Sequence, residues 1–173
     1  AKETANVTNF SLVVSQLAKT QSIASEKITT GQAVGEGSLK LRLGTWDGVP
    51  AFEPSTSADV DISVSADDTV TSIADKINAS NAGVSATVFN DGTSERLLLR
   101  SANTGMVSGF RLQAFDALGG ALTGGADLSR LAFDPASGAF GMAGVGAGAM
   151  QYAQDAKASI DGYDVTSGSN TLE

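Results

Sequence analysis

The pattern in residues 67–101 constrains the fold more than any other part of this protein, because it reads as one helix followed by two strands. Apolar residues recur there at the spacing of a single helix face, at Val70, Ile73, Ala74 and Ile77. This spacing predicts an amphipathic helix near residues 69–80. Asp68 or Thr69 can cap its start, and Gly83 can supply the left-handed conformation that ends it.

Two strands are predicted after this helix. Apolar and polar residues alternate in residues 84–89, and a second, Leu-rich run follows in residues 96–100. Between the two runs, Asn90-Asp91-Gly92-Thr93 has the composition of a tight turn. We therefore expect an antiparallel hairpin.

Alternation predicts further strands at residues 9–18, 37–43, 60–64, 110–115 and 158–165. We expect a loop at residues 44–58, which contain two of the three prolines, and an irregular Gly-rich segment at residues 116–150. Apolar residues make up 42% of the sequence and aromatic ones only 6%, so Val, Leu, Ile and Ala would build the core. The expected class is a β-rich α+β fold of antiparallel sheets with one main amphipathic helix.

We predict two small domains, one inserted into the other. The first strand, at about residues 7–18, and the last hairpin, at about residues 156–167, are expected to pair within a first, discontinuous and incomplete domain. The predicted ranges are residues 4–36 plus 151–173 for this first domain, and residues 37–150 for the inserted one, with a helix–hairpin unit at 60–105 and a Gly/Ala-rich segment at 116–150. No apolar run approaches the length of about 18 residues that crosses a bilayer, so we expect no membrane contact.

Composition excludes several kinds of chemistry. The sequence has no His and no Cys, which removes imidazole bases, Ser-His-Asp relays, thiolate nucleophiles and Cys-based metal sites. No Lys follows a Ser at the spacing of a Ser-x-x-Lys dyad. The net charge of −8 and the scattered basic residues argue against a nucleic-acid partner, because phosphate binding requires a basic patch.

Binding sites for phosphate and calcium have weak signals. The run Gly144-Val145-Gly146-Ala147-Gly148 lacks the Gly-Lys-Ser/Thr ending of a P-loop, and a turn-rich loop explains it better. Asp59, Asp61, Asp67 and Asp68 lack the spacing of a calcium-binding loop, so we expect solvated or helix-capping side chains. No pair among the 19 acidic residues is singled out for glycoside cleavage. We predict no enzymatic activity, catalytic residue, cofactor or metal.

Four apolar residues are candidates for contact with a partner protein. Trp46 and Phe52 stand in the Pro-containing loop, and Phe140 and Met142 stand in the Gly/Ala-rich segment. Large apolar side chains in such loops can form a contact patch. Local packing is the alternative for all four, with Trp46 closing the end of a sheet.

The unit from Val60 to Gly105 resembles the flagellin hook-IN motif of bacterial flagellar axial proteins. The similarity rests on Ile77-Asn78, Ala82-Gly83-Val84, the Asn90-Asp91-Gly92 turn, the Leu-rich strand and Ser101-Ala102-Asn103-Thr104-Gly105. Two flanking stretches narrow the family. "NFSLVVSQLAKTQSIAS" (9–25) and "AQDAKASIDGYDVTSGSNTL" (153–172) are similar to segments of the filament cap family, also called hook-associated protein 2.

This resemblance implies a structural protein at the tip of the flagellar filament. Such caps leave the cell through the flagellar channel, form a homo-oligomeric ring, guide the insertion of flagellin and prevent the loss of flagellin monomers. The implied partners are therefore further copies of the same protein and flagellin, and the implied location is extracellular, at the tip of the bacterial flagellum. Some members also adhere to host mucin or cell surfaces, which makes an extracellular adhesin the alternative function.

Overall fold

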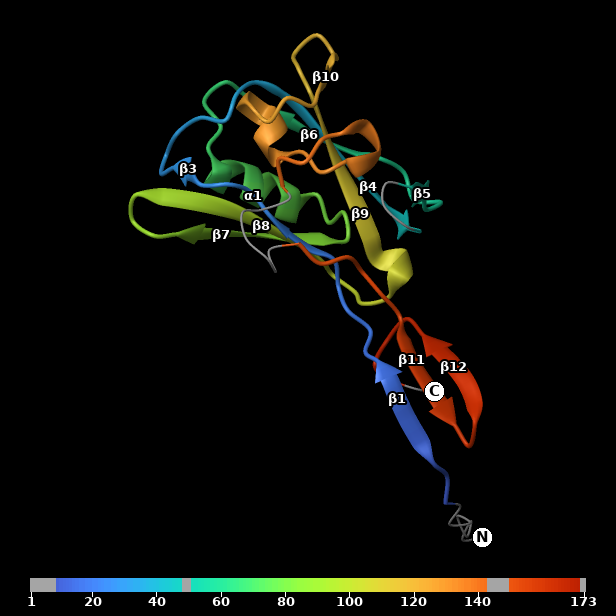
Figure 1. Cartoon of the computed structure of the whole chain (residues 1–173). Helices are drawn as coiled ribbons and strands as arrows, with labels where there is room; N and C mark the ends of the chain where they lie inside the picture. Colours follow the sequence, from blue (N-terminus) through green and yellow to red (C-terminus); the bar gives the residue numbers. More distant parts are fainter. Residues whose placement is uncertain (1–8, 48–50, 143–149, 172–173) are drawn as a thin grey trace, which may run out of the picture.

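The computed structural model describes residues 9–47, 51–142 and 150–171. Within these ranges the protein forms three antiparallel sheets, one α-helix and several short 3₁₀ helices. Figure 1 shows that the two larger sheets and the helix form the main body, while the smallest sheet projects from it and carries the N-terminal part of the protein.

The largest sheet has five strands, with β4 at its centre. β9 pairs along one side of β4, while β6 and β5 share the other side, and β10 pairs with the outer side of β9. The strands are β4 (Gly37–Trp46), β5 (Phe52–Pro54), β6 (Val60–Val64), β9 (Gly109–Phe115) and β10 (Ala121–Leu122). The predicted loop at 44–58 is therefore partly wrong, because β4 continues to Trp46, whose ring packs on Phe52 of β5 with centroids 4.7 Å apart.

The second sheet has four strands around β8. β7 pairs along the whole of one side of β8, and β2 and β3 pair with its C-terminal and N-terminal parts. The strands are β2 (Ser22–Ala24), β3 (Ile28–Thr29), β7 (Val84–Asn90) and β8 (Ser94–Ser101). β2 and β3 fall within residues 4–36, the range predicted for the first domain, yet they pair with β8 of the predicted inserted one. The division into two domains stays a prediction.

The helix α1 (Val70–Ala79) confirms the strongest sequence pattern. All four residues of the predicted apolar face are buried against the sheets: Val70, Ile73, Ala74 and Ile77. Thr69 is the N-cap, and its side chain and that of Ser72 form a reciprocal capping box. The helix ends earlier than Gly83, because Asn81 already takes the left-handed conformation (φ 51°), while Gly83 (φ 74°) turns the backbone into β7.

The smallest sheet consists of β1 (Leu12–Gln16), β11 (Ala156–Ile160) and β12 (Tyr163–Ser167). The predicted pairing of the first strand with the last hairpin is confirmed, since Leu12 faces Ile160 and Ile160 faces Tyr163. The hairpin turns at Asp161-Gly162, both with positive φ. Exposed apolar side chains follow both faces of the first strand, with Leu12, Val13 and Val14 at 45%, 61% and 52% exposure.

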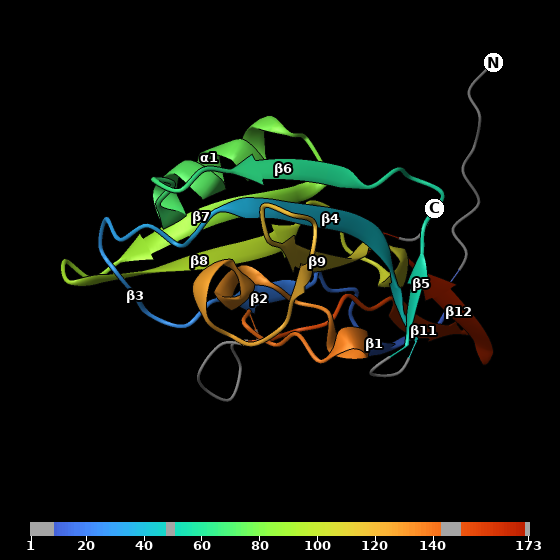
Figure 2. The same ribbon diagram turned by 90° about the horizontal axis from the view of Figure 1, so that it is seen from above.

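A single core joins α1 to the inner faces of the two larger sheets. Residues 126–142 complete this core, which corrects the expectation of an irregular segment at 116–150. This segment contains the short 3₁₀ helices η2 (Asp127–Leu131) and η3 (Pro135–Ser137). A third, η1 (Met106–Ser108), directly precedes β9. Leu128, Leu131 and Phe133 are fully buried, and Phe133 exchanges backbone hydrogen bonds with Leu112 of β9. Figure 2 shows this segment, in orange, against β9. Residues 143–149, which hold most of the Gly/Ala run, lie outside the described residues.

Candidate functional site

The helix–hairpin unit of α1, β7 and β8 is fastened by one side-chain amide. The Asn78 Nδ2 donates to the backbone carbonyl of Ala86 at 2.9 Å, and the Asn78 Oδ1 accepts from the N–H of Ala86 at 2.8 Å. The preceding residue, Ile77, is fully buried. The Ile77-Asn78 pair therefore anchors the end of α1 in two ways, through the core and through the backbone of β7.

The start of α1 carries a buried carboxylate with several donors. Asp68 forms an ion pair with Lys76 and accepts hydrogen bonds from the Ser65 N–H at 2.6 Å and the Ser72 hydroxyl at 2.8 Å. Burial by itself raises the pKa of Asp68, but the bonds from Lys76, Ser65 and Ser72 outweigh it and hold the pKa below its ordinary 3.8. Asp68 therefore has a structural role, but the helix cap predicted at Asp68 or Thr69 is Thr69.

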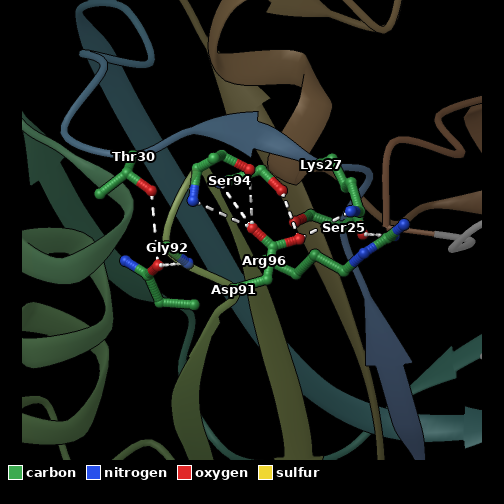
Figure 3. Close-up of polar contacts among 9 residues, drawn as sticks. Ser25, Lys27, Thr30, Asp91, Gly92, Ser94 and Arg96 are labelled. Atoms are coloured by element: carbon green, nitrogen blue, oxygen red, sulfur yellow. Dashed lines mark hydrogen bonds and ion pairs between the residues drawn. The ribbon is translucent and has the colours of Figure 1, made fainter.

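The tip of the β7–β8 hairpin is a second polar cluster, drawn in Figure 3. The Asp91 carboxylate accepts from Lys27 Nζ at 2.7 Å and from the backbone N–H of Ser94 at 2.8 Å. Lys27, followed by Ser94 and Thr93, holds the pKa of Asp91 well below its ordinary 3.8. Beside it, Arg96 donates to the backbone carbonyl of Ser25 at 2.8 Å. These bonds tie the hairpin tip to the segment between β2 and β3.

Two acidic residues considered in the sequence as calcium ligands, Asp59 and Asp61, form ion pairs. Asp59 lies 3.0 Å from Arg42 and 3.7 Å from Lys40, and Asp61 lies 3.6 Å from Lys40. Across the part of the sequence that the structure describes, no group of three or more acidic side chains is placed to hold a metal ion. Over the same ranges, no helix combines the length and apolar character needed to span a membrane.

Two of the four predicted contact residues are buried and present no surface to a partner. Trp46 is 8% exposed, packs edge-on against Phe133 at 5.7 Å and donates from its indole N–H to the backbone carbonyl of Phe110 at 3.0 Å. Met142 is fully buried. For these two residues the burial favours the packing alternative over the contact prediction.

The other two predicted contact residues lie at the surface. Phe140 is 51% exposed and lines an open pocket of about 320 Å³ together with Glu26, Arg130 and glycines. Phe52 is half-buried, and the Arg111 guanidinium lies 5.0 Å from its ring centre. A role for Phe52 and Phe140 in partner contact stays a prediction.

The exposed apolar residues of the smallest sheet were missed as candidates. Phe10 is 64% exposed and Leu17 is 57% exposed, at either end of β1. Tyr163 of β12 is 80% exposed. The alternation in residues 9–18 indicated one buried face, and only the three-dimensional arrangement shows that the described residues place no layer over β1.

Comparison with known proteins identifies the relatives of this fold. The flagellin hook IN motif matches residues 53–103. The B-type flagellar hook-associated protein 2 of Pseudomonas aeruginosa is 28% identical over 99% of this chain. The crystal structure of FliD (HAP2) from Pseudomonas aeruginosa PAO1 superposes with a TM-score of 0.66 at 26% identity, covering all of this chain and 72% of that one. The resemblance to flagellar cap proteins is confirmed.

The structural matches also confirm the fold class. The D2-D3 domains of the flagellar cap protein FliD from Escherichia coli share the β-rich antiparallel fold, with a TM-score of 0.66 at 24% identity over 95% of this chain and 75% of that one. The chain spans about a third, 34%, of the length of the hook-associated protein 2 it matches. These comparisons lend no support to the adhesin alternative.

Proposed function

We propose that this chain forms part of the globular region of a flagellar filament cap protein. The observation that carries the proposal is that the similarity to flagellar cap proteins extends along the whole sequence. Hook-associated protein 2 aligns with 99% of it, and the FliD (HAP2) structure covers all of it. The hook IN motif lies within this range, at residues 53–103. In this role the protein guides flagellin insertion at the filament tip and prevents monomer loss. Its action is structural and not enzymatic.

The partners that follow from this role are flagellin and further copies of the cap protein. Two surfaces support such contacts: the apolar residues along β1, and Phe140 with its adjoining pocket. Exposed apolar patches mark interaction sites more often than chance. We further propose that the protein reaches the filament tip through the flagellar channel, because the absence of Cys avoids disulfides that would hinder passage of an unfolded polypeptide.

The test uses a strain that lacks the parent gene. Flagellin in the medium is separated into filaments and free monomer. Hooks without filaments, together with free flagellin, are expected, and the full-length gene should restore filaments. Normal filaments in the deleted strain, with a defect only in attachment to host material, would contradict the proposal and favour an adhesin.

Single changes in the restoring gene locate the contact surface. Phe140→Ser removes the exposed ring beside the pocket, and Leu118→Ser removes the most exposed apolar side chain (97%) as a matched control. If Phe140 contacts a partner, only the first change lowers the fraction of flagellin in filaments. Equal recovery with both variants would remove Phe140 from the interface.

A further inference from the structure

Three side-chain amides of this protein contact a strand in the same way. In each case the amide N–H donates to the backbone carbonyl of one residue, and the amide oxygen accepts from the N–H of that same residue. The pairs are Asn78 with Ala86 (2.9 and 2.8 Å), Asn170 with Ala18 (3.1 and 2.8 Å) and Gln21 with Phe110 (2.8 and 2.9 Å). A carboxamide carries the same donor and acceptor as a peptide group. Each side chain therefore replaces one residue of a neighbouring strand.

The amide of Asn78 reaches β7 from the side that β8 leaves free. Backbone hydrogen bonds join Gly83 to Ala102 and Asp91 to Ser94, at the two ends of the hairpin. Hydrogen-bonded positions alternate along an antiparallel pair, so the odd-numbered residues of β7 bond to β8. The N–H and C=O of Ala86 consequently point to the outer edge, where both form hydrogen bonds with the Asn78 side chain.

The extension of β1 repeats this arrangement. Lys19 exchanges backbone hydrogen bonds with Gln154, and the same alternation turns the N–H and C=O of Ala18 toward the opposite, outer side. Asn170 occupies both groups there. The same arrangement of amide bonds therefore recurs beyond the β7–β8 hairpin.

The residues of β7 carry none of the sequence features that usually prevent strand addition, so this edge depends for its protection on the neighbouring helix α1. Edge strands are commonly protected by Lys, Pro, bulges or short length, whereas the seven residues Val84–Asn90 include no charged residue, Pro or Gly. Among the described residues β7 pairs with β8 alone. α1 lies along β7 (Figure 1) and supplies Asn78 to the middle of the strand.

We propose that the Asn78 carboxamide closes the edge of β7 and prevents the β7 strand of a second copy from pairing there. A second copy is the excluded partner because two identical uncharged edges, related by a two-fold axis in antiparallel orientation, are complementary to each other. This role is independent of the capping function, since it depends only on the hydrogen bonds of the free edge.

The direct test compares Asn78→Ala with the wild type and with Asn81→Gly. Asn81 is a matched control because it is an exposed asparagine at the same helix end, its positive φ suits glycine, and its amide bonds within its own turn. Light scattering after size-exclusion chromatography is measured over a range of protein concentrations. Asn78→Ala is expected to gain a species of twice the wild-type mass as concentration rises, and Asn81→Gly is expected to behave as the wild type.

Hydrogen exchange locates the contact. At low concentration the Ala86 amide of Asn78→Ala should exchange about fivefold faster than in the wild type, which corresponds to the net worth of one hydrogen bond. At high concentration the same amide should become protected again, because the second strand replaces the lost carboxamide.

A double variant separates edge pairing from non-specific association. Thr87→Lys, combined with Asn78→Ala, places a charge on an exposed position near the centre of β7, where two copies would repel each other. Restored wild-type mass would support edge pairing, whereas persistent association would overturn it. A folded Asn78→Ala that keeps the wild-type mass at every concentration would also overturn it. If circular dichroism shows that Asn78→Ala is unfolded, Asn78→Ser, too short to reach both groups, replaces it in every comparison.

Discussion

The Nζ of Lys27 lies 2.7 Å from a carboxylate oxygen of Asp91, although 64 positions separate the two residues in the sequence. The pair joins the segment between β2 and β3 to the tip of the β7–β8 hairpin. The hairpin tip is thus held by a residue outside the matched motif at residues 53–103.

The Lys27–Asp91 contact predicts a specific pH dependence. Since the folded-state pKa of Asp91 lies below its ordinary 3.8, with Lys27 as the main cause, the contact stabilises the fold above pH 3.8 and loses this effect as the pH falls below that value. Asp91→Asn should therefore be less stable than the wild type at neutral pH, and the difference should shrink in acid. Urea unfolding at several pH values measures this, with exposed Asp67→Asn as the control. A stability difference that does not change with pH would contradict the assignment.

The capping box at the start of α1 predicts a local loss of stability. Thr69→Ala removes the side-chain oxygen that accepts from the Ser72 N–H, and loss of such a cap costs about 1 kcal/mol of unfolding free energy. Thr71→Ala, at an exposed position in the first turn, should change stability by less than about 0.5 kcal/mol. Thermal unfolding of the two variants compares them, and equal melting temperatures would show that the cap contributes nothing.

Two glycines, Gly92 and Gly105, have the same φ of 95° but differ in the space around them. A Cβ on Gly92 would meet no atom within 4 Å, whereas a Cβ on Gly105 would lie 2.6 Å from the backbone oxygen of Gly168. Gly92→Ala should cost about 1–2 kcal/mol, the usual penalty for a left-handed residue. Gly105→Ala should cost more, because its backbone (φ 95°, ψ 149°) lies in a region that only glycine adopts readily and because the backbone of Gly168 must also move. Chemical unfolding would contradict this if both variants lost the same stability.

A substitution at Trp46 tests whether this residue stabilises the core. Trp46→Phe removes the indole donor to Phe110 and leaves unfilled space beside Phe133 and Tyr152. We expect a loss of about 1–3 kcal/mol in unfolding free energy. Filament assembly by the folded variant should be unchanged, because Trp46 presents no contact surface. Unchanged stability with impaired assembly would restore the contact prediction.

The parts of the fold that follow from local periodicity were predictable from the sequence. The apolar stripe of α1 and the Asn90–Thr93 turn appear where expected, because a helix face and a tight turn are determined by residues close in sequence. The pairing of β1 with β11 was also predicted, as part of the expected discontinuous domain. β5 was missed because its pairing with β4 depends on the contact between Trp46 and Phe52, which no local pattern specifies.

Sequence patterns do not show which apolar residues are covered by the rest of the molecule. Met142 and Phe140 are two positions apart in the same Gly/Ala-rich stretch, yet one is fully buried and the other is half exposed. The difference arises from the contact of residues 132–142 with β9, which no local pattern specifies. The edge-closing role of Asn78 is likewise visible only once its amide and Ala86 are placed together.

The smallest sheet has a consequence for the order of folding. The Ser11 N–H bonds to Asp161 across 150 residues of sequence, so β1 cannot pair with β11 until all of these residues are available. Contacts that close such long loops form slowly, because the entropy of loop closure must first be overcome. The main body, whose α1 and β7–β8 contacts are local, can therefore mature first. We therefore expect the junction of β1 with β11 to close last, so that its apolar side chains stay unpaired longest during folding.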